Sequence, residues 1–177
     1  MPIDYDAEWR KSPAAKAGLA CPDCHDHRAR GGHDARWLRQ AVDVVVTEAE
    51  SGLNVTLTAQ DVGHRVPTGD LFRHLVVGSR SNDGTLLGWT LLARELALDP
   101  FRVVRDTRLV PGVPKTVRVP EGRVFVELRL VDPVDASFLP DHEVRTVVCD
   151  PCRVSIRVKR AAHIDRKGES GGEFDAR

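Results

Sequence analysis

Residues 42–60 read VDVVVTEAESGLNVTLTAQ, and this stretch decides the fold. Apolar residues recur at every second position on both sides of a central Glu50-Ser51-Gly52. A period of two is that of a β-strand with one buried face. Glu-Ser-Gly between two such runs is typical of a hairpin turn. We therefore predict two antiparallel strands, over residues 42–47 and 53–60.

The chain downstream of this hairpin repeats the same pattern. Valine- and leucine-rich runs alternate with turn residues such as Pro111-Gly112, and no helical period lies between them. Many short strands at such spacing predict an antiparallel β-sandwich over residues 42–160, in a mostly β protein. Residues 161–177 are rich in glycine, serine and charge, so we expect a disordered tail. The further predicted strands are 72–79, 86–98, 102–110, 115–119, 123–131 and 144–158.

Residues 1–41, upstream of the hairpin, form an irregular segment with short helices. Ser12-Pro13 is typical of a helix start, and Gly18 lies where that helix would end. Asp34 is a candidate N-cap for a second short helix that runs through Ala41. The chain thus divides into a helical segment and a sandwich domain.

Composition excludes several classes of protein. The 177 residues carry 26 basic and 26 acidic side chains, and a net charge of zero argues against a nucleic-acid binder. No apolar run approaches the roughly 20 residues of a membrane span. The polar stretch 1–11 lacks the apolar core of a secretory signal.

The motif Cys21-Pro22-Asp23-Cys24-His25 lies in the helical segment. In C-x-x-C-H, two thiols can bond the vinyl groups of a haem while the adjacent histidine reaches the iron. The spacing therefore predicts a c-type haem, with Cys21 and Cys24 as anchors and His25 as the proximal iron ligand.

Two further histidines are candidates for the opposite face of the iron. His64 lies in Gly63-His64-Arg65-Val66-Pro67-Thr68-Gly69, a turn-rich segment after a predicted strand. His33 lies in Gly31-Gly32-His33-Asp34, which can loop round a haem edge. Glycine and proline make such loops suited to presenting a side chain, although the His64 loop can equally be a structural turn. We favour His64 as the iron ligand over His33.

The remaining cysteines open an alternative. Cys149 and Cys152 form a second C-x-x-C pair, about 125 residues after the first. Four thiolates from two such pairs can bind a structural zinc ion, which would join the helical segment to the last strands. A third hypothesis is an interaction module in which the cysteine pairs form disulfides or have no role.

The order of these motifs resembles that of multihaem cytochrome c proteins. Residues 8–130 carry the resemblance, through the C-x-x-C-H motif, the Gly63–Gly69 loop, Arg73 and the stretch Asp106–Gly112. In that family a haem-bearing N-terminal part precedes a β-sandwich with a GH-x-x-PTG loop. Relatives usually carry several haem motifs, whereas this chain has one, so it resembles a reduced or truncated member.

The resemblance and the motif together predict an electron carrier rather than an enzyme. Two histidine ligands leave no iron position open to a substrate. Redox proteins, other cytochrome subunits among them, are the expected partners. Haem attachment normally takes place outside the cytoplasm, so a haem-bearing form is expected in the periplasm or extracellularly. The zinc alternative implies a cytoplasmic protein.

Overall fold

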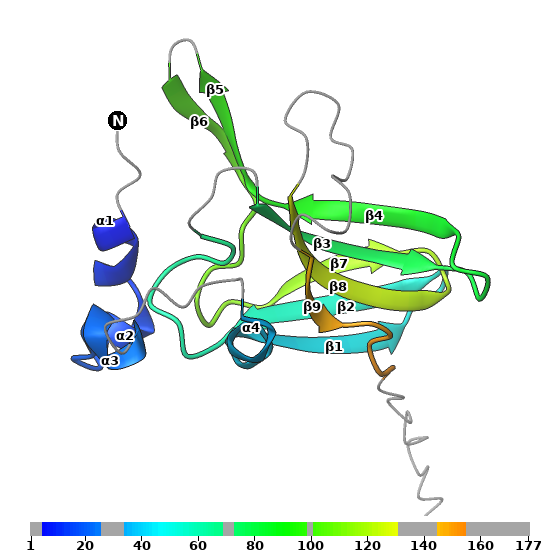
Figure 1. Ribbon diagram of the computed structural model, residues 1–177, viewed down its shortest axis with the longest axis horizontal. Helices are drawn as coiled ribbons and strands as arrows, with labels where there is room; N and C mark the ends of the chain where they lie inside the picture. The colour runs from blue at the N-terminus through cyan, green and yellow to red at the C-terminus, as the bar shows by residue number, and fades with distance from the viewer. Residues whose placement is uncertain (1–4, 26–33, 69–72, 99–100, 131–144, 155–177) are drawn as a thin grey trace, which may run out of the picture.

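The computed structural model describes residues 5–25, 34–68, 73–98, 101–130 and 145–154. In this part of the chain, short helices come first and strands follow (Figure 1). The helices are α1 (Tyr5–Arg10), α2 (Pro13–Lys16), α3 (Cys21–His25) and α4 (Ala35–Ala41). The strands are β1 (Val42–Glu48), β2 (Leu53–Ala59), β3 (Arg73–Arg80), β4 (Leu86–Leu92), β5 (Arg94–Leu98), β6 (Phe101–Asp106), β7 (Lys115–Val119), β8 (Arg123–Leu130) and β9 (Thr146–Cys149).

The opening hairpin is confirmed. β1 and β2 pair antiparallel, with Val46 opposite Val55. Buried and partly exposed side chains alternate along all of β2, as a period of two requires. Gly52 closes the turn with a φ of 83°, in the left-handed region that glycine adopts without a steric penalty.

Two antiparallel sheets build the sandwich. One has the strand order β1-β2-β7 and the other β4-β3-β8-β9. Both contribute to one apolar core, the first through residues such as Leu57 and the second through residues such as Leu75 and Val126. After β9, Val154 bridges to Val46 of β1, which links the sheets along one side. The predicted β-sandwich architecture is therefore confirmed.

The predicted strand 86–98 is two strands. β4 ends at Leu92 and β5 begins at Arg94, with the buried Ala93 between them. The Thr107 hydroxyl accepts the Ala93 N–H at 3.0 Å, and the Thr107 N–H donates to the Ala93 carbonyl at 2.8 Å. These bonds replace ladder bonds of the main sheet. The hairpin β5–β6 consequently projects away from the sandwich (Figure 1).

Two other predicted strands are shorter than expected. β6 ends at Asp106, whose carboxylate accepts the Arg108 backbone N–H at 3.2 Å and turns the chain. β9 ends at Cys149, where a disulfide to Cys152 closes a tight turn. The predicted strand end at 155–158 and the predicted tail at 161–177 lie outside the described residues.

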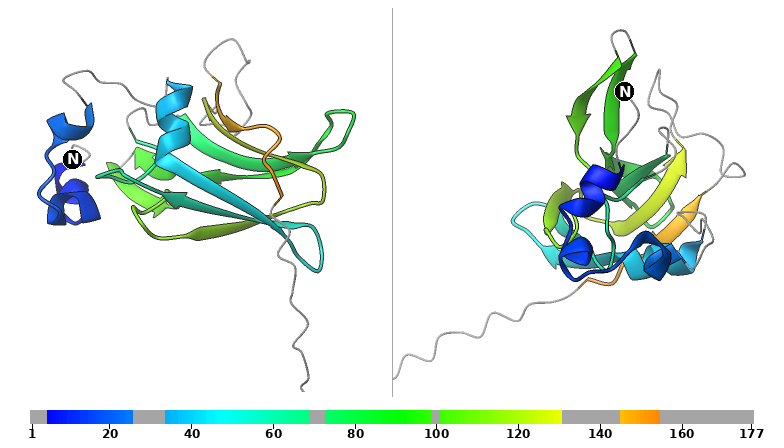
Figure 2. Two further views of the ribbon diagram at one scale, coloured as in Figure 1. Left: turned by 90° about the horizontal axis from the view of Figure 1, so that it is seen from below. Right: turned by 90° about the vertical axis from the view of Figure 1, so that its left-hand side faces the viewer.

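The helices α2 and α4 begin where the sequence predicts caps. The Ser12 hydroxyl accepts the Ala15 N–H, and the Asp34 carboxylate accepts the Arg36 N–H at 2.9 Å. α1, α2 and α3 gather at one end of the sandwich, and α4 leads directly into β1 (Figure 2). Among the described residues, no helix has the length and apolar character needed to cross a membrane.

We predict that Leu57→Ala lowers the free energy of unfolding by about 2–5 kcal/mol, because Leu57 is fully buried between the sheets. Urea denaturation monitored by circular dichroism measures this change. Val104→Ala is the control, since Val104 is 62% exposed on the projecting hairpin and its truncation should change stability by less than about 0.5 kcal/mol. Equal losses in the two variants would contradict the proposed core.

Candidate functional site

A cavity of about 630 Å³ lies where the helical segment meets the sandwich. Its walls come from the segment from α1 to α3, the helix α4, the loop that follows β2, and Leu128 of β8. Most of its lining surface is apolar. The side chains that bear on its chemistry are Trp9, Cys21, Cys24, His25, Trp37 and His64.

The helix α3 presents the C-x-x-C-H motif to this cavity. The Asp23 carboxylate accepts the Ala20 N–H at 2.7 Å and fixes the start of the helix. Residues three and four apart lie on one helix face, so Cys21, Cys24 and His25 share a face. Both thiols are free, with Cys21 exposed and Cys24 partly buried. All three residues of the motif line the same cavity.

His64 lies beside His25 in the lining of the cavity. Their ring centroids are 6.1 Å apart and their planes differ by 13°. His25 also lies 6.4 Å from the Trp37 ring, at 15° between planes. The structure therefore brings His64, the favoured second histidine, to the C-x-x-C-H histidine across 39 residues of sequence. His33, the other candidate, lies outside the described residues.

Burial and one hydrogen bond determine the state of the His64 ring. Desolvation lowers the pKa of His64, although the bond to a backbone carbonyl opposes the shift. Its Nδ1 lies 3.3 Å from the Arg65 carbonyl oxygen. A carbonyl can only accept, so Nδ1 carries the proton in this bond and Nε2 keeps a lone pair. His64 is thus suited to act as a neutral ligand through Nε2.

The loop that carries His64 is held at several points. Val66 and Leu109 exchange two backbone hydrogen bonds, of 3.0 and 2.8 Å, in an isolated bridge. Gly63 lies against Trp9 so closely that a Cβ atom there would come within 2.6 Å of the Trp9 Cδ1. The sequence-based view of this segment as a stiff loop rich in turns is consistent with these contacts.

An ion cluster lies behind the loop. The Arg108 guanidinium bonds Glu8 at 2.6 Å and Asp106 at 2.8 Å, and only 4% of its side chain is exposed. Arg94 pairs with the same Glu8 carboxylate. Arg65, next to His64, pairs with Asp106 at 3.0 Å. Burial alone would lower the pKa of Arg108, but its bonds to Asp106 and Glu8 raise it, so the guanidinium stays charged.

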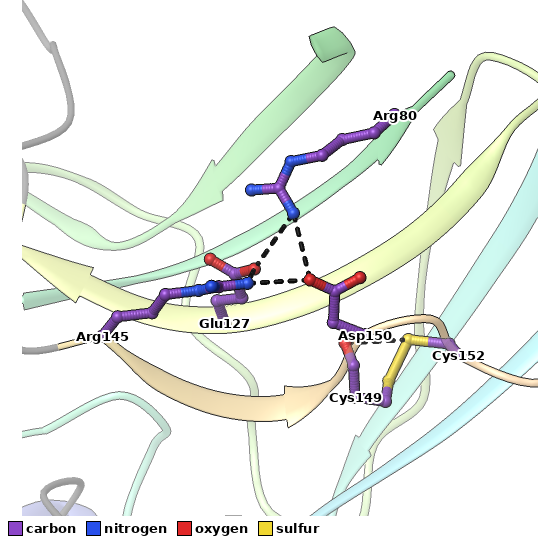
Figure 3. Close-up of a disulfide and its surroundings, with 6 residues drawn as sticks. All are labelled: Arg80, Glu127, Arg145, Cys149, Asp150 and Cys152. Atoms are coloured by element: carbon purple, nitrogen blue, oxygen red, sulfur yellow. Dashed lines mark hydrogen bonds and ion pairs between the residues drawn. A yellow bond between two sulfur atoms is a disulfide. The ribbon is translucent and has the colours of Figure 1, made fainter. Parts of the chain in front are cut away.

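The second cysteine pair lies elsewhere. Cys149 and Cys152 are joined by a disulfide at the end of β9 (Figure 3). Neither is among the described residues that line the cavity. Asp150 between them pairs with Arg80 and Arg145, which also pair with the fully buried Glu127. This second ion cluster stabilises the outer face of the sheet β4-β3-β8-β9.

The four cysteines therefore do not come together as the zinc alternative requires. Within the described ranges, no three histidine, cysteine, aspartate or glutamate side chains gather to hold a metal ion. The hypothesis of cysteine disulfides applies to one pair, because Cys21 and Cys24 remain free thiols. The geometry gives the zinc alternative no support.

Several site residues could not be found from the sequence. Glu8 contacts a guanidinium 100 positions away, and no local spacing signals such a pair. Trp37 lies in the helix predicted after Asp34, but a helical pattern does not place its ring beside His25. Arg108 belongs to a stretch that carries the family resemblance, but its contact with Glu8 requires the folded chain. No known protein family, curated protein or solved structure matches the chain.

The ion cluster predicts a specific acid sensitivity. Burial alone would raise the pKa of Asp106, but its hydrogen bonds with Arg108 and the charges of Arg108 and Arg65 lower it below the usual value. Because the pKa is lower in the folded chain, the carboxylate stabilises the fold above the usual Asp pKa. That contribution is lost as the pH falls through the folded-state value.

We predict that Asp106→Asn lowers the free energy of unfolding at pH 7 by about 1.5–3 kcal/mol, as expected for lost hydrogen bonds to a charged group. The variant should also lose less stability than the wild type on acidification below pH ~4. Denaturant titrations at a series of pH values measure both effects. Asp43→Asn, at an exposed position of β1, is the control. The same acid dependence in wild type and Asp106→Asn would contradict the role of this carboxylate.

Proposed function

We propose that the protein binds one c-type haem in this cavity and transfers electrons. The observation that carries the proposal is the His25–His64 pair, two nearly parallel imidazoles with centroids 6.1 Å apart in the wall of a cavity that both motif cysteines also line. Cys21 and Cys24 are the proposed thioether anchors, His25 the proximal ligand and His64 the distal ligand. The resemblance to multihaem cytochrome c proteins points the same way.

The distance between the two ring centroids supports the proposal. A metal–imidazole nitrogen bond is about 2 Å long, and the ring centre lies about 1 Å behind that nitrogen, so two axial imidazoles have centroids about 6 Å apart. The observed 6.1 Å matches this separation. The Nδ1 of His25 is buried without a hydrogen-bond partner among the described residues, so the fold does not use this ring for an internal bond.

The cavity itself fits a flat apolar cofactor. Its volume of about 630 Å³ lies within the range of about 300–1,000 Å³ that is usual for cofactor and ligand sites. The lining is mostly apolar, and it includes the aromatic side chains of Trp9 and Trp37, which suit packing against a flat apolar group. The buried Leu128 of β8 also lines the cavity.

The ligand set favours electron transfer over catalysis. When bound, a haem iron supplies a reversible one-electron couple whose potential depends on ligation, burial and hydrogen bonds. His64, neutral and held through Nδ1, keeps a lone pair on Nε2 for a ligand without a change of protonation. With His25 as the other proposed ligand, a bound haem would keep no iron position open to a substrate.

A second observation concerns the compartment. Disulfides persist in oxidising surroundings, and the Cys149–Cys152 pair forms one. This agrees with a location outside the cytoplasm, where thioether attachment to Cys21 and Cys24 takes place. Redox proteins are the partners that this function implies.

The attachment is tested by expression with export in a bacterial host that has haem-attachment machinery. We expect the wild type to keep its haem through denaturation in acid acetone, because thioether bonds survive it. Cys21→Ser with Cys24→Ser should abolish attachment. Cys149→Ser with Cys152→Ser is the matched control and should keep the haem. A colourless wild type, or one that carries a zinc ion instead, would overturn the proposal.

The distal ligand is tested by optical spectroscopy of the ferric protein. We expect a low-spin spectrum for the wild type and a shift to high spin for His64→Ala, since an iron position then opens to water. Added imidazole should restore the low-spin spectrum. His33→Ala should remain low-spin. The reverse result would assign the ligand to His33 and leave the His64 loop as a structural turn.

A further inference from the structure

The helix α1 contacts the His64 loop through two consecutive residues. Glu8 accepts the Arg65 backbone N–H at 3.3 Å, directly after His64. Trp9 lies against Gly63, directly before His64. The helical segment that carries His25 therefore contacts the His64 loop at the residues directly before and after His64.

The ion-pair partners of Glu8 connect α1 to the sandwich as well. Arg108, which bonds Glu8, also donates from Nη1 to the Pro67 carbonyl at 3.4 Å. Arg94 of β5 bonds Glu8 as well, so one carboxylate joins α1 to the base of the β5–β6 hairpin and to the loop. Its side chain is 16% exposed, so solvent screens these contacts only weakly.

The charge of Glu8 is needed for this arrangement. Two guanidinium groups converge on its carboxylate, and a carboxylate can accept from several donors at once. Removal of the negative charge leaves the buried Arg108 with Asp106 as its remaining anionic partner. A displacement of α1 would then carry the helical segment, including His25, away from His64.

Resting on the proposed function, we infer that Glu8 is a positioning residue: its ion pairs with Arg94 and Arg108 set the spacing of His25 and His64, and with it the strength of the distal iron bond. Glu8 does not touch the cavity's ligand atoms, so it acts through the loop. External imidazole would compete with His64 for the iron. It would bind more tightly where His64 is held less firmly, so its affinity measures the strength of the distal bond.

The test uses the exported holoprotein and its Glu8→Gln variant, which keeps the size of the side chain. We expect Glu8→Gln to retain covalent haem but to bind external imidazole about tenfold or more tightly than the wild type, the factor for losing one charged hydrogen bond. It should also show a larger high-spin fraction. Glu95→Gln is the matched control, because Glu95 pairs with Arg105 in an exposed ion pair on the projecting hairpin.

A second variant tests the same inference in case Glu8→Gln does not fold. Gly63→Ala places a Cβ against Trp9 and separates α1 from the loop without changing any charge. It should raise imidazole affinity in the same direction. Low-spin wild type with unchanged imidazole affinity in both variants would overturn this inference alone. A wild type without haem would overturn the proposed function, and the inference with it.

Discussion

The burial of the Arg108 guanidinium is the constraint on which the site depends. A charge with so little solvent contact needs partners that offset its lost hydration. It finds Asp106 on its own turn, Glu8 on α1 and the Pro67 carbonyl in the His64 loop. These partners come from three distant stretches of the chain. Satisfying one buried cation therefore fixes how the helical segment docks on the sandwich.

This electrostatic docking compensates for a small apolar interface. No residue of α2 or α3 is fully buried, so these helices contribute little hydrophobic stabilisation of their own. Trp9 against Gly63 supplies one close apolar contact. A cofactor bonded to α3 and enclosed by α4 and the loop would add the apolar contact area that the helices lack.

Local patterns predicted most of the fold. The alternation over 42–60 gave the first hairpin, and the side chains of Ser12 and Asp34 cap helices as expected. The strand break at Ala93 could not be foreseen, because it depends on hydrogen bonds to Thr107 from a different strand segment. Sequence periodicity predicts which side chains are buried. It does not predict hydrogen bonds between a side chain and a distant backbone group.

The candidate site divides in the same way. Cys21, Cys24 and His25 share one helix turn, so their spacing alone predicts a common site, and the loop chemistry around His64 predicts a presented imidazole. Local spacing could not predict the role of Glu8, because its contact with Arg108 forms only in the tertiary structure. Cys149 and Cys152 are close in sequence, but their C-x-x-C spacing suits a pair of metal ligands as well as a disulfide. Only the folded structure distinguishes these two possibilities.

The most direct test of the central claim is a crystal structure of the exported protein. The proposal predicts one porphyrin bonded to Cys21 and Cys24, with Nε2 of His25 and Nε2 of His64 each about 2 Å from the iron. A structure without haem in this cavity would contradict the claim, and so would a haem whose second axial ligand is not His64.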